Sequence, residues 1–212
     1  MKLRTLAALS LIIFCLSFSG CGKVWFVDFT DTVLADDFFV DGGSADPMGL
    51  VLDEGYVSSL VAFEGDFTVT IIFDLFVNAS LDAVNFTIAL ADDISEEPNN
   101  FINNWGRGLG NPANEEYGVR DFDYLEITPR YIVDEDAAFP GINRSGQNKW
   151  VLKKEGSHVK ITMNETSTVA EFDISHYQGS EFHVSIHGKT WNAGVLRFKS
   201  IKVEFFNSII LP

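Results

Sequence analysis

The stretch Asp66–Asn78, DFTVTIIFDLFVN, is the clearest pattern in the chain. Its apolar side chains occupy every second position, at Phe67, Val69, Ile71, Phe73, Leu75 and Val77. Polar residues fill most of the positions between them. Because successive side chains of a strand point to opposite faces, this alternation predicts a strand with one buried face.

The same alternation recurs later in the chain, over residues 84–90, 159–163 and 182–186. Shorter strand candidates are Val24–Phe29, Phe38–Val40, Tyr56–Phe63, Tyr124–Ile127, Trp150–Lys153 and Thr168–Ile174. Near the C-terminus the apolar positions change parity between Phe198 and Ile201, which predicts a bulge near Lys199-Ser200. Turns are expected at Asp41–Gly43, Asp53–Gly55, Glu155–Ser157 and Asn192–Gly194.

No sustained helical periodicity is found after the N-terminal segment. Many short strands separated by turns predict an all-β fold, in which two antiparallel sheets stack with their outer faces wet. The tryptophans Trp25 and Trp150 lie in strand-like runs and are expected in the core.

The N-terminal segment has the layout of a secretory signal. Lys2 and Arg4 precede an apolar run from Leu6 to Phe18, and small residues follow. This run is shorter than the roughly 20 apolar residues of a membrane-spanning helix. We therefore expect a signal peptide over residues 1–20 and one β-sandwich domain over residues 21–212.

The segment ends in Phe18-Ser19-Gly20-Cys21, which resembles the lipobox of bacterial lipoproteins. The resemblance implies cleavage before Cys21 and attachment of a lipid to it, which would anchor an exported protein in the cell envelope. Gly22, in place of the aspartate typical of inner-membrane retention, implies the outer membrane. The only other cysteine, Cys15, lies within the signal, so no disulfide is expected.

The mature chain is strongly acidic. Residues 1–20 hold two basic and no acidic residues, so residues 21–212 carry a formal charge of −17. A negative field of this size repels nucleic acid and anionic lipid head groups. The charge thus argues against a nucleic-acid partner, and the membrane is expected as a partner only through the lipid anchor.

The strand pattern resembles the concanavalin A-like lectin/glucanase (laminin G-like) jelly roll. Three stretches carry the resemblance: residues 26–31 with Phe38-Phe39 and Gly42-Gly43, residues 64–73, and residues 196–205. The resemblance implies a two-sheet antiparallel jelly-roll sandwich. In that family it also implies glycan recognition on a concave sheet or on rim loops, often with calcium, and some members are glycosidases or lyases.

A glycan site needs flat aromatic faces beside hydroxyl-binding polar groups. The long segment 92–118 supplies Asn103, Asn104, Trp105 and Arg107, and a late turn supplies Trp191-Asn192. These six residues are the candidate ligand-binding set, although each tryptophan has packing on the core as its alternative.

A catalytic alternative is Asp121-Phe-Asp-Tyr-Leu-Glu126, which resembles the Glu-x-Asp-x-x-Glu signature of laminarinase-type glucanases. The resemblance gives Asp121 the role of nucleophile, Asp123 that of tuning the pair, and Glu126 that of acid/base. Aspartate at the first position departs from the signature, and an acidic strand edge is the favoured interpretation. The sequence therefore favours a binding protein over an enzyme.

Metal ligands are the remaining candidates. Asp36, Asp37, Asp41 and Asp46 surround Gly42-Gly43 and are calcium candidates, with solvated acidic loops as the alternative. His183 and His187 share a strand face about 13 Å apart, too far to hold one ion, and are interpreted as solvent-facing.

Three functions remain open at this stage: glycan binding at the envelope, glucanase-like hydrolysis, and a non-catalytic structural or protein-interaction role.

Overall fold

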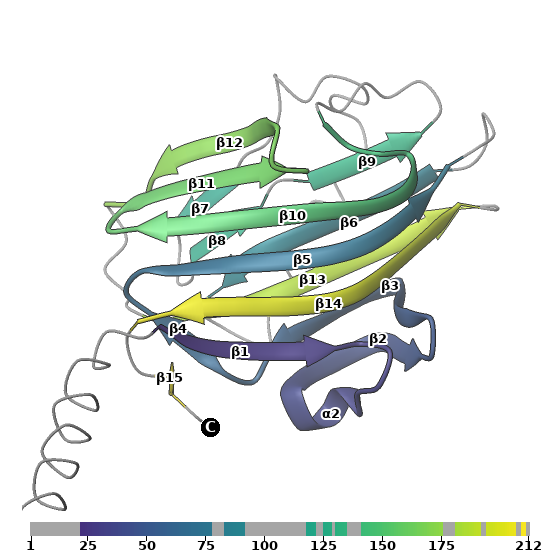
Figure 1. Cartoon of the computed structure of the whole chain (residues 1–212), viewed down its shortest axis with the longest axis horizontal. Coiled ribbons are helices and arrows are strands. Elements are labelled where there is room, and N and C mark those ends of the chain that lie inside the picture. Colours follow the sequence, from purple (N-terminus) through teal and green to yellow (C-terminus); the bar gives the residue numbers. More distant parts are fainter. Residues whose placement is uncertain are drawn as a thin grey trace, which may run out of the picture.

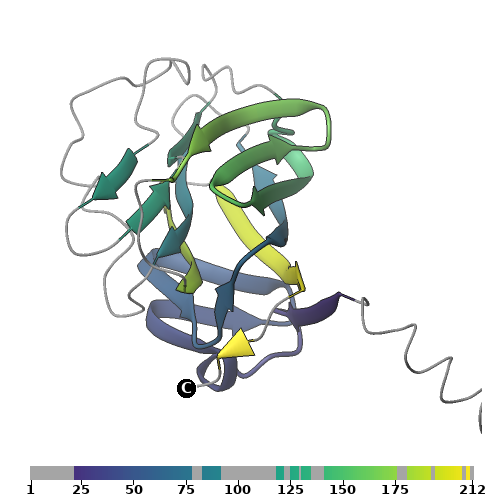
Figure 2. The same cartoon turned by 90° about the vertical axis from the view of Figure 1, so that its left-hand side faces the viewer.

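The computed structural model of the chain describes residues 22–77, 83–91, 118–121, 125–128, 130–134, 141–175, 181–191, 194–206 and 209–210. Figure 1 shows two layers of antiparallel strands stacked face to face, and Figure 2 shows the same layers turned by 90°. The predicted all-β sandwich is therefore confirmed. Within the described ranges, no helix has the length and apolar character needed to cross a membrane.

The front layer of Figure 1 is called the first sheet. Its strands, in spatial order, are β12 (Ser167–Asp173), β11 (His158–Met163), β10 (Ser145–Glu155), β5 (Phe67–Phe76), β14 (Val195–Phe205) and β1 (Lys23–Asp28). The decisive stretch of the sequence forms β5, near the middle of this sheet, where it pairs with β10 and β14.

The layer behind it is the second sheet. Its strands are β2 (Phe38–Asp46), β3 (Gly49–Ser59), β13 (Glu181–Trp191), β6 (Ala83–Ala91), β8 (Leu125–Thr128), β9 (Arg130–Asp134) and β7 (Gly118–Asp121). Both β8 and β9 pair with β6, and β7 pairs with β8. The two sheets meet where Phe198 of β14 pairs with Leu50 of β3.

Three further elements complete the described part of the chain. The short strand β4 (Ala62–Glu64) pairs with β13 and with β15 (Ile209–Ile210). A single helical turn, α2 (Leu34–Asp37), connects β1 to β2, and Leu34 is buried in the core.

The core lies between the sheets and is built from the alternating apolar positions. Phe73 of β5 is fully buried, with its ring centroid 5.1 Å from that of Phe86 on β6 and 5.8 Å from that of Phe198 on β14. Trp150 is fully buried, and Trp25 packs against the core while partly exposed. The prediction of a core position is thus confirmed for Trp150 and only partly for Trp25.

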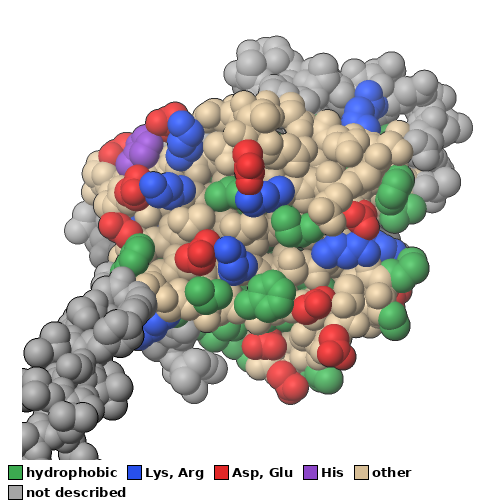
Figure 3. Space-filling model, in the orientation of Figure 1, with side chains coloured by type: hydrophobic (Ala, Val, Ile, Leu, Met, Phe, Trp, Pro, Cys, Tyr) green, Lys and Arg blue, Asp and Glu red, His purple; other side chains and the backbone are tan. Residues whose placement is uncertain are grey.

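The outer face of the first sheet is polar and carries ion pairs, seen as neighbouring red and blue side chains in Figure 3. The pairs are Lys149–Glu165, Lys153–Glu155, Lys160–Glu171, Lys199–Asp74, Lys202–Glu204 and Arg197–Asp46. Exposed pairs of this kind contribute little stability each. They offset one another's charge on this face of an acidic molecule.

The predicted bulge in β14 is present, since the register with β5 shifts between Phe198 and Ser200. The turn expected at Asp53–Gly55 is wrong, because these residues lie inside β3. Gly55 serves a different purpose there: a Cβ atom on it would lie 2.3 Å from the carbonyl oxygen of Asp41 in β2. The turn expected at Asp41–Gly43 is instead a register shift within β2, and Gly42 has a φ of +74°.

Candidate functional site

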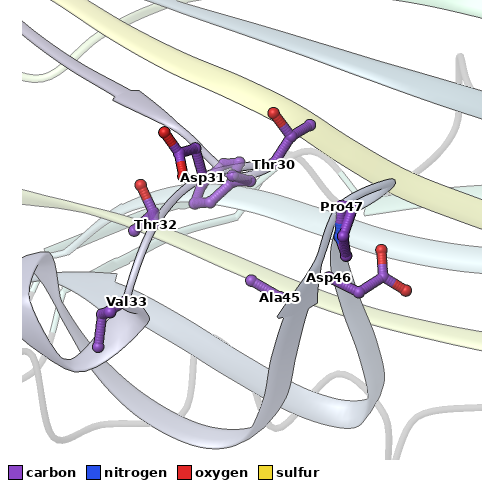
Figure 4. A pocket seen from close by; sticks show the side chains of 8 residues that line it. Thr30, Asp31, Thr32, Val33, Ala45, Asp46 and Pro47 are labelled. Carbon is purple, nitrogen blue, oxygen red and sulfur yellow. The ribbon is translucent and has the colours of Figure 1, made fainter.

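A pocket of about 260 Å³ opens where the connection after β1 faces the β2–β3 hairpin. Figure 4 shows the two segments side by side, with Asp31 and Thr32 on one and Ala45 and Pro47 on the other. The lining residues are Phe29, Thr30, Asp31, Thr32, Val33, Ala45, Asp46 and Pro47.

The first wall of the pocket is held by a turn at the end of β1. The carboxylate of Asp28 accepts hydrogen bonds from the backbone N–H of Thr30 at 2.9 Å and from its hydroxyl at 2.7 Å. These bonds lower the pKa of Asp28, with the hydroxyl as the larger cause. Phe29, fully buried, donates its backbone N–H to the carbonyl of Lys199 at 2.9 Å. The wall is therefore fixed to β14.

The second wall is the tip of the β2–β3 hairpin, where Asp46 pairs with Gly49. The carboxylate of Asp46 accepts the backbone N–H of Met48 at 2.7 Å and two hydrogen bonds from Arg197. The pKa of Asp46 is lowered, chiefly by Arg197. Gly49 has a φ of +119°, and a Cβ on it would lie 2.4 Å from the carbonyl oxygen of Phe198. Only glycine allows this close approach.

The pocket offers mixed chemistry. Asp31 is exposed and Thr32 is half-buried, and their carboxylate and hydroxyl groups accept and donate hydrogen bonds. Val33, which is 67% exposed, and Pro47 add apolar surface at the edges. Hydroxyl-binding groups beside small apolar surfaces suit a polyhydroxylated ligand of modest size.

The outer face of the second sheet carries polar side chains that are closed to solvent. Ser58 and Ser185, opposite each other on β3 and β13, have hydroxyl oxygens 2.6 Å apart and are fully buried. His187, opposite Tyr56, is only 2% exposed. The interpretation of His187 as solvent-facing is therefore wrong. His183 is half-buried and places Nδ1 2.6 Å from the carbonyl oxygen of Ser59.

Most of the predicted glycan-binding residues lie outside the described residues. These are Asn103, Asn104, Trp105, Arg107 and Asn192, as well as the lipidation residue Cys21. Trp191 is the last residue of β13, where it pairs with Ala83 of β6. Their role in binding stays a prediction.

The predicted catalytic motif spans the connection between two strands rather than one strand. β7 ends at Asp121 and β8 begins at Leu125, with Asp123 outside the described residues. Asp121 pairs with Leu125, and Glu126 pairs with Arg120. The catalytic roles of these carboxylates stay a prediction.

The calcium candidates Asp36, Asp37, Asp41 and Asp46 all lie in described segments. Across those segments, no three His, Cys, Asp or Glu side chains come close enough to hold a metal ion. Asp46 instead pairs with Arg197 at 2.8 Å. The four aspartates therefore do not fit a calcium ion as a group.

Sequence reasoning missed the pocket residues Asp31, Thr32 and Pro47. The run Asp28–Thr32 directly after a strand was a usable signal, because Asp and Thr side chains form turns there. That this run faces residues 45–47 depends on strand pairing, which the local pattern does not reveal.

Comparison with known proteins gives the fold. No protein-family model matches the chain, and no curated protein does either. Among solved structures, a protein of unknown function with a galectin-like fold from Bacillus subtilis is 13% identical, with a TM-score of 0.50, covering 88% of this chain and 96% of its own. The Crh5 transglycosylase in complex with NAG is 10% identical, with a TM-score of 0.50, covering 89% and 86%.

The VIP36 exoplasmic/lumenal domain, in a Ca²⁺/Man2-bound form, is also similar. It is 10% identical, has a TM-score of 0.49, and the match covers 87% of this chain and 89% of its own. Taken together with the strand topology, the first two structures identify the described domain as a galectin-like β-sandwich.

Proposed function

We propose that this protein is an exported lipoprotein whose lectin-like domain binds carbohydrate at the cell envelope. The observation that carries the proposal is the open pocket lined by Thr30, Asp31 and Thr32 on a galectin-like sandwich. The similar structure of the Crh5 transglycosylase is of a complex with NAG. The proposed ligand is a neutral saccharide, because an acidic chain repels anionic ones.

In the pocket, Asp31 is the principal acceptor for sugar hydroxyls. The carboxylate of Asp46 is already occupied by Arg197 and Met48, so its role is to hold the wall in place. Thr32 adds a hydroxyl, while Val33 and Pro47 contact the C–H edges of the ring. A carboxylate accepts stronger hydrogen bonds than a neutral oxygen does.

The binding test uses residues 22–212 on a broad glycan array, in calcium and in EDTA, followed by titration of any sugar that binds. Asp31→Ala is expected to weaken the affinity by about tenfold or more, as for losing a hydrogen bond to a charged group, and Thr32→Ala by up to about tenfold, as for losing a hydrogen bond between neutral groups. Asp36→Ala, an exposed acidic residue on α2 that does not line the pocket, is the matched control.

Two results would count against the binding proposal. A blank array in both conditions would favour a structural or protein-interaction role instead. Unchanged affinity in Asp31→Ala and Thr32→Ala would show that the sugar binds outside this pocket. A calcium requirement would point to acidic residues outside the described ranges.

Anchoring is the second half of the proposal: cleavage after residue 20, a lipid on Cys21 and residence in the outer membrane. Mass spectrometry of the N-terminal peptide from native membranes would detect the lipid. Cys21→Ser is expected to release the protein from the membrane fraction. An unmodified Cys21 would overturn this half while leaving the binding test unaffected.

A further inference from the structure

Three large apolar side chains are exposed near the start of the described chain. Val24 and Phe26 of β1 are 58% and 57% exposed, and Phe206, just after β14, is 69% exposed. Figure 3 shows hydrophobic side chains gathered in the lower centre, over the position of β1 in Figure 1. We call these three residues the β1 surface.

The strand register explains why two of these side chains point outward. Trp25 and Val27 turn toward the core, so Val24 and Phe26 face the other way. Val24 pairs with Glu204 and Phe26 pairs with Lys202 on β14. The side chains of Lys202 and Glu204 form an ion pair at 2.9 Å, so this part of the face carries no net charge.

Phe206 is placed beside the first described residue. A Cβ atom on Gly22 would lie 3.4 Å from the Phe206 ring, so Gly22 lies beside that ring. Cys21 is the residue immediately before Gly22, and consecutive Cα atoms are about 3.8 Å apart. A lipid on Cys21 would therefore be attached one residue before Gly22, which lies beside Phe206, and Val24 and Phe26 follow along β1.

Transfer of exposed apolar side chains out of water lowers the free energy of the system, and aromatic rings favour the membrane interface. An anchor at residue 21 holds this part of the domain at the bilayer surface. A neutral apolar surface is suited to that position, whereas the acidic remainder of the chain is not.

We propose that the β1 surface lies on the membrane, with Val24, Phe26 and Phe206 in the lipid interface. This inference rests on the proposed lipidation of Cys21. It sets the orientation of the domain: β1 starts at the bilayer and leads to the pocket that begins at Phe29. Six strand residues span about 20 Å, so the pocket opens about that distance along the domain from the anchor.

The test uses the full lipidated protein in phosphatidylcholine vesicles that contain nitroxide-labelled lipid. Once Cys21 is lipidated, the mature chain has no free thiol, so Val24→Cys and Phe26→Cys each take a single environment-sensitive dye. Val195→Cys is the matched control, because Val195 is also an exposed valine of the first sheet. It begins β14, whereas Phe206 follows the other end of that strand.

On vesicles, the dyes at positions 24 and 26 are expected to shift their emission to the blue and to be quenched by the nitroxide. The dye at position 195 is expected to keep the emission it has in water. Equal emission and quenching at all three positions would overturn the proposal. So would a blue shift at 24 and 26 that appears without vesicles and grows with concentration, since a second copy of the chain would then cover the surface.

Mass spectrometry of each labelled protein separates the two proposals. If Cys21 carries lipid but the dyes at 24 and 26 stay in water, the proposal that the β1 surface lies on the membrane is refuted, and the lipid anchor stands. If Cys21 carries no lipid, both the anchor and this orientation are refuted.

Discussion

Arg197 of β14 donates two hydrogen bonds from Nη1 to the carboxylate of Asp46, at 2.9 and 2.8 Å. The bonds join the β2–β3 hairpin of the second sheet to β14 of the first sheet. Because Asp46 also lines the pocket, this contact links the stability of the sandwich to the shape of the candidate site.

Replacing Arg197 with methionine is expected to raise the pKa of Asp46 toward its usual value. Since the folded-state pKa is lowered, the contact stabilises the protein above the usual carboxyl pKa, and this contribution is lost as the pH falls through the folded value. An NMR titration of the Asp46 carboxyl carbon measures the shift. Lys153→Met, which removes the Lys153–Glu155 pair, is the control. If Asp46 titrated in the same way in Arg197→Met and in the wild type, Arg197 would not be the cause of its lowered pKa.

The buried hydroxyl pair of Ser58 and Ser185 predicts a non-additive effect. Ser185→Ala removes the partner of a fully buried hydroxyl and is expected to cost about 1–3 kcal/mol. The double variant Ser58→Ala/Ser185→Ala should cost less than the sum of the two single variants, because no hydroxyl then remains unpaired. Urea unfolding of the four proteins measures the coupling. Strict additivity would show that the pair does not act as a unit.

Lys154 is a buried cation at one end of the core. It is 7% exposed, donates to the carbonyls of Gly65 and Gly156 at 2.8 and 2.9 Å, and lies over the Phe67 and Phe182 rings. Burial lowers the pKa of its ammonium group, and the nearby Asp66 carboxylate opposes this effect.

Between that lowered pKa and the usual lysine value, the unfolded chain therefore holds more protons than the folded one. The free energy of unfolding is expected to rise with pH across this window. Lys154→Met should reduce this rise, as measured by unfolding at neutral and alkaline pH. A rise of the same size in the variant would show that Lys154 is not its source.

Because Phe73 contacts Phe86 and Phe198 at the centre of the core, its removal is expected to cause a large loss of stability. Phe73→Ala is expected to cost about 3–5 kcal/mol, from lost apolar burial and the cavity left behind. Ile72→Ala is the control, because the neighbouring side chain points to the outer face and is only half-buried. Equal losses of stability in the two variants would contradict the assignment of Phe73 to the core face and Ile72 to the outer face of β5.

The strands with regular alternation were predictable because one face of each is buried. Which side chains of β5, β6, β11 and β13 face the core follows from that pattern alone, and the bulge after Phe198 follows from the change of parity. The glycines misled the prediction. Gly55 is needed where two backbones come close, and this requirement looks like a turn in the sequence.

The candidate site was harder to predict for a related reason. Its walls, 29–33 and 45–47, come together through the pairing of β2 with β3 and the contact of Asp46 with Arg197. Residues 34–44 separate the two walls, Arg197 lies far along the chain from both, and no periodic pattern links these segments. His187 was misplaced because its strand alternates as a half-exposed strand does, although both of its faces are buried from Val184 to Gly188.

The register of β1 on β14 pairs Lys23 with Phe205, so the first described strand has its partner in the last long one. The ribosome synthesises β1 long before β14. Strand β1 therefore cannot take its place at the edge of the first sheet until β14 has been made. The first sheet therefore cannot be completed until nearly all of the chain has been made. Such a delay is compatible with passage through a narrow translocation channel, which an early-folding domain would obstruct.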